Sequence, residues 1–414
     1  MLTLTFCGFD GERDRGQSKG SALLRPLVAV MLAMQLALSG TPALAQARPV
    51  APALVSVEAA FQRAATVLFD QLDKVGGEAT VVIDPLIDGV SGLQTAATRS
   101  FDKRIAALVA ERYKRVTILP MSVENLAKAR FIFIGTFNTI NNAGQATGPR
   151  DAYWICFAVV DQQSKTVVAR SAARAVLSDV DVTPAASFIN RPVWGIDAAT
   201  QAYIDACQRS QPGSPVAPAY LNQLQAAARI SEAGQAYETG QPGRAVELYT
   251  AAQRELGGDQ LRALNGLYLS YAALGDKQKA DAAFGELIDR GLALGRLGVM
   301  FLFQPNSTSF NADQRVSADY GKWVQEIAAR IGQSKVCLQV VGHASRTGSA
   351  AANDRLSLER ARRIVGLLGQ QRAEISPRLR ASGVGFRETL VGLPRDDAST
   401  DVDRRVEFKA APCA

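Results

Sequence analysis

Histidine is almost absent from this chain, which has one in 414 residues. A metal site built from several histidines is therefore excluded, and no Cys-x-x-Cys pair offers zinc an alternative. The chain also lacks the Gly-x-x-x-x-Gly-Lys-Ser/Thr phosphate loop, and no Gly-x-Gly-x-x-Gly follows a predicted strand. Carboxylates are plentiful, but nothing selects a glycosidase pair among them. These absences favour a protein that is not an enzyme and has neither metal nor cofactor.

Charge of one sign does not dominate the chain either. Lysine and arginine number 46 against 39 acidic residues, so the formal net charge is +7. The basic residues are scattered instead of forming a tail, and we therefore expect no nucleic-acid partner. An apolar content of 47% with 21% charged residues is typical of a globular protein. The length predicts two or three domains.

The N-terminus has the pattern of a secretory signal peptide, predicted over residues 1–45. An apolar run at Pro26–Leu38 follows a basic leader, and Thr41–Ala45 supplies small residues for cleavage before Gln46. A run of about thirteen residues is too short to cross a bilayer. We expect a periplasmic protein with no membrane-spanning segment in the mature chain. Association with the outer membrane is left open.

Cysteine usage agrees with export, because an even number of cysteines in an oxidising compartment predicts disulfides. If a last strand at 405–410 runs antiparallel to a strand at 336–341, Cys413 lies beside Cys337. We predict this disulfide. Four buried thiols are the alternative. The mature chain has four cysteines: Cys156, Cys207, Cys337 and Cys413.

Residues 53–209 alternate between helical and β-branched segments and predict an α/β domain with a mixed sheet. A hairpin is expected at 161–165. Three segments in this region follow one another in an order that is similar to FlgO/CsgG-like periplasmic domains. They are Val-Val-Ile-Asp-Pro, then Ala-Arg-Phe-Ile-Phe-Ile-Gly-Thr-Phe, and then Val-Val-Asp in the hairpin. The expected strands are 79–84, 115–119, 129–137, 153–160 and 166–173, and the expected helices are 55–72, 100–113 and 123–128.

A linker at 210–219, rich in proline, precedes a helical region at 220–296 that contains an internal repeat. A glycine, a small residue, an aromatic residue and a further apolar residue recur after 35 positions. This spacing resembles the tetratricopeptide repeat. An ordinary helical spacer with chance periodicity is the alternative. The repeated positions are Gly240, Ala245, Tyr249 and Ala252, then Gly275, Ala280, Phe284 and Leu287.

Three separated motifs occur in order in the last part of the chain. The first is Gly-His-Ala-Ser-Arg-Thr-Gly-Ser at 342–349, the second places Leu-Ser-x-x-Arg-Ala at 356–361, and the third is Asp-Arg-Arg-Val-Glu at 403–407. Together they resemble the OmpA-like peptidoglycan-associating domain, over 297–410. The resemblance implies a βαβαββ fold. Its predicted elements are strands at 300–303, 336–341 and 405–410, a helix at 319–331, and a second helix that carries Leu-Ser-x-x-Arg-Ala.

The same resemblance implies a ligand, the diaminopimelate of the peptidoglycan stem peptide. Its carboxylate would bind Arg360, and an aspartate would bind its ammonium group. Ser345 stands at the position of that aspartate. A lost charge-assisted contact weakens binding by roughly 1–3 kcal/mol. Asn353, Leu356 and Arg360 share one helix face, which places Arg360 toward the loop at 342–348.

Other positions of the motifs are expected to be mainly structural. Asn353 would organise the loop, and Arg404 or Arg405 would bind either a peptide carboxylate or a structural one. Arg360 itself has a structural alternative, an ion pair within the domain. The hydroxyl of Ser345 also has a structural alternative, in which it caps the following turn. The remaining structural positions are Gly342, His343, Gly348 and Leu356.

The whole sequence therefore predicts a periplasmic envelope protein with three parts: the α/β domain, the tetratricopeptide-like helices and the OmpA-like domain. It would associate non-covalently with peptidoglycan and scaffold an unidentified envelope protein. An adaptor whose OmpA-like domain no longer binds diaminopimelate is the alternative. A wall-modifying enzyme in the N-terminal domain is a third hypothesis.

Overall fold

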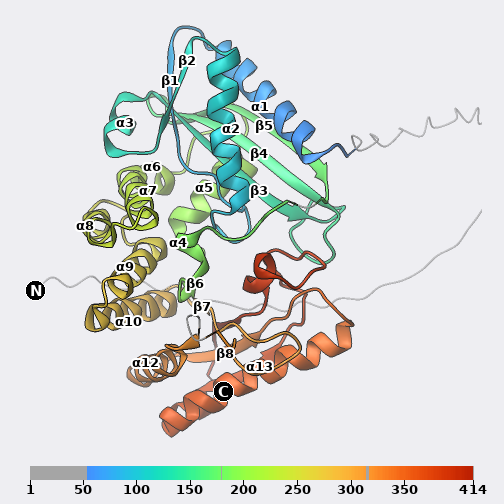
Figure 1. The fold of residues 1–414 in the computed structure, drawn as a ribbon, viewed down its shortest axis with the longest axis vertical. Coiled ribbons are helices and arrows are strands. Elements are labelled where there is room, and N and C mark those ends of the chain that lie inside the picture. The colour runs from blue at the N-terminus through green and yellow to red at the C-terminus, as the bar shows by residue number, and fades with distance from the viewer. Residues whose placement is uncertain (1–53, 179, 314–316, 414) are drawn as a thin grey trace, which may run out of the picture. The chain divides into compact units, whose positions relative to one another are not determined.

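The computed structural model describes residues 54–178, 180–313 and 317–413 (Figure 1). The predicted signal peptide lies outside these residues. The described residues belong to one compact unit. None of the helices among them combines the length and the apolar character that crossing a membrane requires.

The first sheet is mixed, as the sequence predicts, and has the strand order β2-β1-β3-β4-β5. The strands β2, β1 and β3 are parallel, whereas β3, β4 and β5 pair antiparallel. The chain thus adds β2 on one side of β1 and then crosses to the other side for β3. The bounds are β1 Ala79–Ile83, β2 Val116–Pro120, β3 Phe131–Ile140, β4 Ala152–Asp161 and β5 Thr166–Val176.

Helices cover both faces of this sheet, because successive strand residues point to opposite sides. Phe133 and Phe137 pack with helices α1 and α2, while Ile132 and Ile134 pack with α5 and α6 on the other face. Ser56 and Thr95 cap α1 and α2 by accepting a backbone N–H bond. The bounds are α1 Val57–Asp73, α2 Ala96–Arg112, α3 Val123–Lys128, α4 Ala186–Ile189, α5 Ala198–Gln208 and α6 Pro218–Asn222.

Two antiparallel helix pairs follow, and the repeated residues occupy equivalent places in them. Gly240 and Gly275 end the first helix of each pair with φ of 75° and 74°, where a side chain would be strained. The ring of Tyr249 lies against Gly266, where an added Cβ would be 2.1 Å from it. The tetratricopeptide assignment itself stays a prediction. The helices are α7 Leu224–Glu238, α8 Pro242–Gln253, α9 Leu261–Ala273 and α10 Lys277–Ala293.

The second sheet is also mixed, with the order β6-β7-β10-β8-β9, and α12 and α13 pack against it. Within this second sheet, β8 and β9 pair parallel, and the other neighbouring strands pair antiparallel. Strand β6 comes from the segment assigned to the N-terminal domain, so that segment contributes to both sheets. The bounds are β6 Val193–Trp194, β7 Arg296–Val299, α12 Tyr320–Gln333, β8 Cys337–Gly342, α13 Ala350–Gln371, η1 Ala373–Arg378, β9 Leu379–Gly383, η2 Ala398–Asp403 and β10 Val406–Ala411.

Two details of the predicted second sheet are wrong. The first strand is β7 and not 300–303, where Phe303 forms an isolated bridge with Phe310. The amide of Leu302 instead donates to the Tyr320 hydroxyl, and Phe301 packs on Phe310 and Tyr320. The apolar run therefore reflects burial in an aromatic cluster. The second detail concerns 336–341, which the sequence predicts as the central strand of this sheet. The central strand is β10 instead, and β8 lies beside it.

Both cysteine pairs lie at disulfide distance. The antiparallel register places Ala411 opposite Cys337, so that the Cα atoms of Cys337 and Cys413 are 5.2 Å apart. The Cα atoms of Cys156 and Cys207 are 6.0 Å apart. The predicted proximity of Cys337 and Cys413 is thus present.

Replacing Cys337 and Cys413 together by serine should lower the free energy of unfolding by roughly 2–4 kcal/mol, because the bond closes a long loop in the unfolded chain. Urea unfolding of oxidised wild type and variant measures the difference. Under reducing conditions the two proteins should have the same stability, because the wild type then also lacks the Cys337–Cys413 bond. Loss of the Cys156–Cys207 bond lowers the stability of both proteins equally. A wild type whose two residues both react with a thiol reagent after unfolding contradicts the assignment.

Candidate functional site

The three C-terminal motifs meet where β8 ends. The amide of His343 donates to the Arg405 carbonyl over 3.0 Å, and Nη1 of Arg360 donates to the His343 carbonyl over 3.3 Å. Gly342 faces the backbone of α13, where an added Cβ would lie 1.8 Å from the Ser357 carbonyl oxygen. The glycine of the first motif is therefore required by the close approach of the helix that carries the second.

Asn353 organises the loop that follows β8. Its Nδ2 donates to the carbonyl oxygens of Thr347 and Ser349, over 2.6 and 3.1 Å. The Ser349 hydroxyl in turn caps α13, and Gly348 takes a φ of 81°. The side chain of Asn353 is buried in these contacts. Its amide nitrogen is thus engaged by the backbone of the loop.

Arg360 lies deep in the interior, with 1% of its surface exposed. Besides the bond to His343, Nε donates to the Ser307 carbonyl over 3.1 Å and Nη2 to the Gln304 carbonyl over 3.0 Å. The guanidinium also lies over the Phe303 ring, 5.0 Å from its centre. Burial, and next the charge of Arg404, lower its pKa to about 10, so it stays charged at neutral pH.

Ser345 and Arg360 do not form a matched pair of charged groups. Ser345 is 4% exposed, and its hydroxyl lies 3.4 Å from that of Thr347. The helix face carrying Asn353 and Arg360 is turned toward the loop, as the spacing predicts, while Leu356 is half-buried. The loop and helix are therefore arranged as the motifs suggest, but the arginine is closed off from solvent.

Arg404 and Arg405 are both paired with carboxylates of the same chain. Arg404 forms ion pairs with Asp396 and Asp401. Arg405 Nε donates to Glu407 over 2.7 Å, and its guanidinium lies 5.2 Å from the centre of the Trp194 ring. Both arginines are nearly inaccessible, so these contacts are structural.

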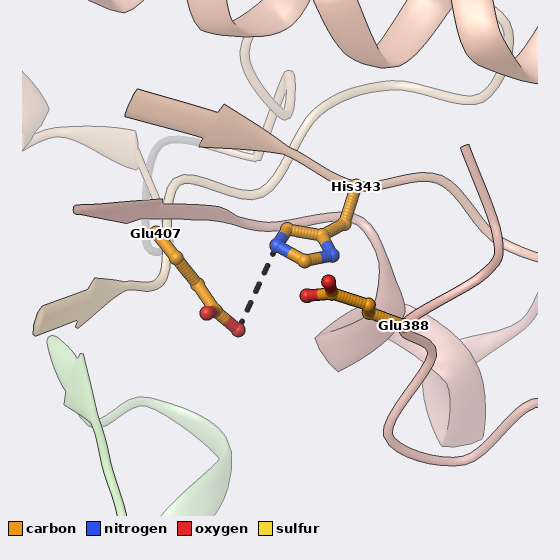
Figure 2. Close-up of side chains that lie close together, drawn as sticks. All are labelled: His343, Glu388 and Glu407. Atoms are coloured by element: carbon orange, nitrogen blue, oxygen red, sulfur yellow. Dashed lines mark ion pairs between the residues drawn. The ribbon is translucent and has the colours of Figure 1, made fainter. Parts of the chain in front are cut away.

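Figure 2 shows the imidazole of His343 between the carboxylates of Glu388 and Glu407. Its Nε2 is 3.6 Å from Oε1 of Glu407, and the three potential ligand atoms lie within 4.8 Å of one another. The donor types suit a divalent ion. However, Arg296 and Arg405 already neutralise Glu407, and Lys409 pairs with Glu388. These cations oppose the approach of a further positive charge, and we interpret the cluster as a structural ion network.

Sequence reasoning missed the residues that complete this network. Trp194 lies about two hundred positions before Arg405 in the chain, and its ring is flanked by Arg296 and Arg405. Glu388 lies in a segment without periodic pattern. No local signal could have identified either residue, because both act through contacts between distant segments.

Comparisons with known proteins gave similarity to solved structures over less than a third of the chain. No family model matches the chain, and no curated protein matches it. Among solved structures, the peptidoglycan-associated lipoprotein from Burkholderia pseudomallei is 22% identical, covering 27% of this chain and 88% of that one, with a TM-score of 0.23. The periplasmic domain of Helicobacter pylori MotB is 20% identical, covering 29% and 76%, with a TM-score of 0.24.

The cell wall anchor of the T6SS from Pseudomonas aeruginosa is 19% identical, covering 31% of this chain and 95% of that one, again with a TM-score of 0.24. These matches each span less than a third of the chain. At such TM-scores they carry no inference about function, which has to come from the residues themselves.

The His343 environment predicts a specific pH dependence of stability. Burial, together with the charges of Arg405, Lys409 and Arg296, lowers the pKa of His343 well below 6.5. Below about pH 6.5 the imidazole is therefore protonated in the unfolded chain but not in the folded chain. The free energy of unfolding then falls as the pH falls, by up to about 1.4 kcal/mol per pH unit. A His343→Gln variant should lack this component in urea unfolding between pH 7.5 and 5.5.

The comparison is clean because the chain has no other histidine. Carboxyl groups titrate equally in wild type and variant, so the difference between the two slopes isolates the imidazole. Parallel slopes would show that His343 titrates in the folded protein as it does in the unfolded chain, and would contradict the prediction.

Proposed function

We propose that the chain is a cell-envelope protein of the periplasm that associates non-covalently with peptidoglycan through residues 297–410, while its N-terminal and helical parts hold a protein partner. The observation that carries the proposal is the meeting of the three motifs at the end of β8, with Arg360 at their centre. A guanidinium is the side chain best suited to a carboxylate, because it offers a rigid fork of donors.

Peptidoglycan binding at Arg360 requires an exchange of partners. A diaminopimelate carboxylate would replace the carbonyl oxygens of Gln304 and Ser307, which now accept from Nη2 and Nε. A charged acceptor is stronger than a carbonyl, but the segment 304–307 has to move aside first. Without an acidic residue at Ser345, the ammonium group of the ligand gains no ion pair there. We therefore expect weaker wall binding than an open, two-charge site provides.

A second candidate is an adaptor that does not bind the wall. The 1% exposure of Arg360 favours it, because a guanidinium already supplied with acceptors has no need of a ligand. In this alternative the C-terminal part serves the fold and a protein contact, and the three motifs keep their structural roles.

Co-sedimentation of the mature chain with purified diaminopimelate-type sacculi tests the proposal. Wild type should be retained, free diaminopimelate should release it, and Arg360→Ala should lose retention. The matched control is Arg355→Ala, which removes an exposed arginine from the same helix and should keep retention. Circular dichroism of each variant establishes that it is folded.

Absence of wild-type retention at low salt would leave the adaptor as the function. Retention that Arg360→Ala does not change, with the variant folded, would place wall binding outside the predicted site. A Ser345→Asp variant adds a gain-of-function arm. If Arg360 binds diaminopimelate, the new carboxylate should tighten retention about tenfold or more through the ammonium group.

A further inference from the structure

A cavity of about 390 Å³ lies at the carboxyl ends of β1 and β2 in the first sheet. Ile83 and Asp84 line it from the end of β1, and Ile118 from β2, while Asp102 reaches it from α2. The helix pairs close it on the far side, through Ile230 of α7 and Tyr249 of α8. The volume is within the range of small-molecule sites.

Its position in the sheet is one that favours ligand binding. The chain leaves β1 to form β2 on one side and β3 on the other, so the strand order reverses at β1. In open α/β sheets, ligands bind outside the carboxyl ends of the parallel strands at such a reversal. The cavity lies at this end of β1. The cavity adjoins this reversal, but its strand residues come from β1 and β2 and none from β3.

Two carboxyl groups line the cavity without a cation, that of the buried Asp84 and that of the half-buried Asp102. Asp84 is 2% exposed and accepts a hydrogen bond from the Tyr220 hydroxyl over 2.9 Å. Asp102 accepts from the Leu86 amide over 3.2 Å. Among the residues that the structure describes, neither aspartate has an ion-pair partner. A buried carboxyl group without a cation shifts its pKa upward and keeps a proton, and a bound cation would take the place of that proton.

The basic side chains around the cavity are engaged elsewhere. Arg99 pairs with Glu238, and Arg262 donates to the side chains of Gln260 and Gln223. Lys103 is exposed at the wall. Arg262 and Arg99 therefore act on the two carboxylates only through space.

The titration behaviour of the pair agrees with an uncompensated site. Burial raises the pKa of Asp84 to about 6, against the opposing effects of Arg262 and the Tyr220 hydroxyl. Burial and the nearby charge of Asp84 raise the pKa of Asp102 to about 8, against the opposing effects of the Leu86 amide and Arg99. Burial keeps the hydroxyls of Tyr203 and Tyr220 neutral by raising their pKa values well above 10.

We propose that this cavity binds a small organic cation, a primary amine on an aliphatic stem, with its ammonium group on Asp84 and Asp102. An ammonium group carries three donors, which the carboxylate oxygens can accept. The stem would lie against Ile83, Ile118 and Ile230, where each buried methylene adds roughly fourfold in affinity. The site is independent of peptidoglycan association and goes beyond it.

The proposed site binds the amine more tightly at higher pH. An amine stays protonated between pH 6 and 8, whereas the two carboxyl groups lose their protons over that range. Binding at pH 6 therefore has to displace more of the carboxyl protons than binding at pH 8, where Asp84 is ionised and Asp102 is partly ionised. An anion would show the opposite pH dependence of binding, because the ionised carboxyl groups would repel it.

Isothermal titration of the full mature chain with n-pentylamine tests the proposal. 1-Pentanol, which has the same stem without charge, should bind about tenfold or more weakly, and pentanoate should not bind. The amine should bind more tightly at pH 8 than at pH 6. Equal binding of amine and alcohol would show that the cavity binds the apolar stem without recognising the charge, and would overturn the proposal.

Asp84→Asn and Asp102→Asn should each weaken amine binding about tenfold or more at pH 8, whereas Asp281→Asn, an exposed substitution on α10, should leave it unchanged. Folding is followed separately. Because an ionised Asp102 opposes folding, Asp102→Asn should melt above wild type at pH 8 and near it at pH 4. A stabilised variant that still binds the amine as wild type does would overturn the assignment.

Discussion

The guanidinium of Arg360 is held by backbone carbonyls, and the C-terminal part of the fold depends on that arrangement. A buried cation without a counter-charge is destabilising unless its donors are satisfied. Here the carbonyls of Gln304, Ser307 and His343 supply the acceptors, and the Phe303 ring lies over the charge. The segment after β7, the end of β8 and helix α13 are thereby fixed relative to one another.

A second set of contacts ties this part to the first sheet. Asp403 accepts the amides of Leu390, Val391 and Gly392. The loop so formed receives a hydrogen bond from Arg150, whose Nη2 donates to the Thr389 carbonyl over 3.0 Å. Strand β6 adds to the same connection, because its Trp194 donates to the Ser91 carbonyl over 2.8 Å. The C-terminal sheet is therefore joined to the N-terminal part by buried polar contacts.

Two buried charge sites thus contrast within one chain. Arg360 has backbone acceptors and Glu407 has counter-ions from the chain itself, so a ligand there has to displace contacts that the fold already makes. At Asp84 and Asp102 no ion-pair partner is present among the described residues, and a cavity is open beside the two carboxyl groups. A protein can retain such an unfavourable pair where a ligand supplies the missing charge.

The sequence by itself determined the elements whose pattern is local. Period-two and period-3.6 spacing predicted β1 to β5 and α1 to α3. The resemblance to the OmpA-like domain predicted α12 and the last strand, and antiparallel pairing placed Cys413 beside Cys337. It failed at 300–303, where apolar residues serve an aromatic cluster, and it missed β6 and β9, which are short and depend on their neighbours. The order of the strands within each sheet could not be predicted, because periodicity does not determine which strands are neighbours.

Within the candidate site, the motifs identified Arg360, Asn353 and Gly342, because their spacing on one helix and one loop is a property of the chain. Only the tertiary structure decided that Arg360 is closed off by the segment at 304–307 and that Asp84 and Asp102 share a cavity. The physical reason is that burial and charge compensation are sums over segments far apart in sequence. A residue's type and local spacing do not contain that sum.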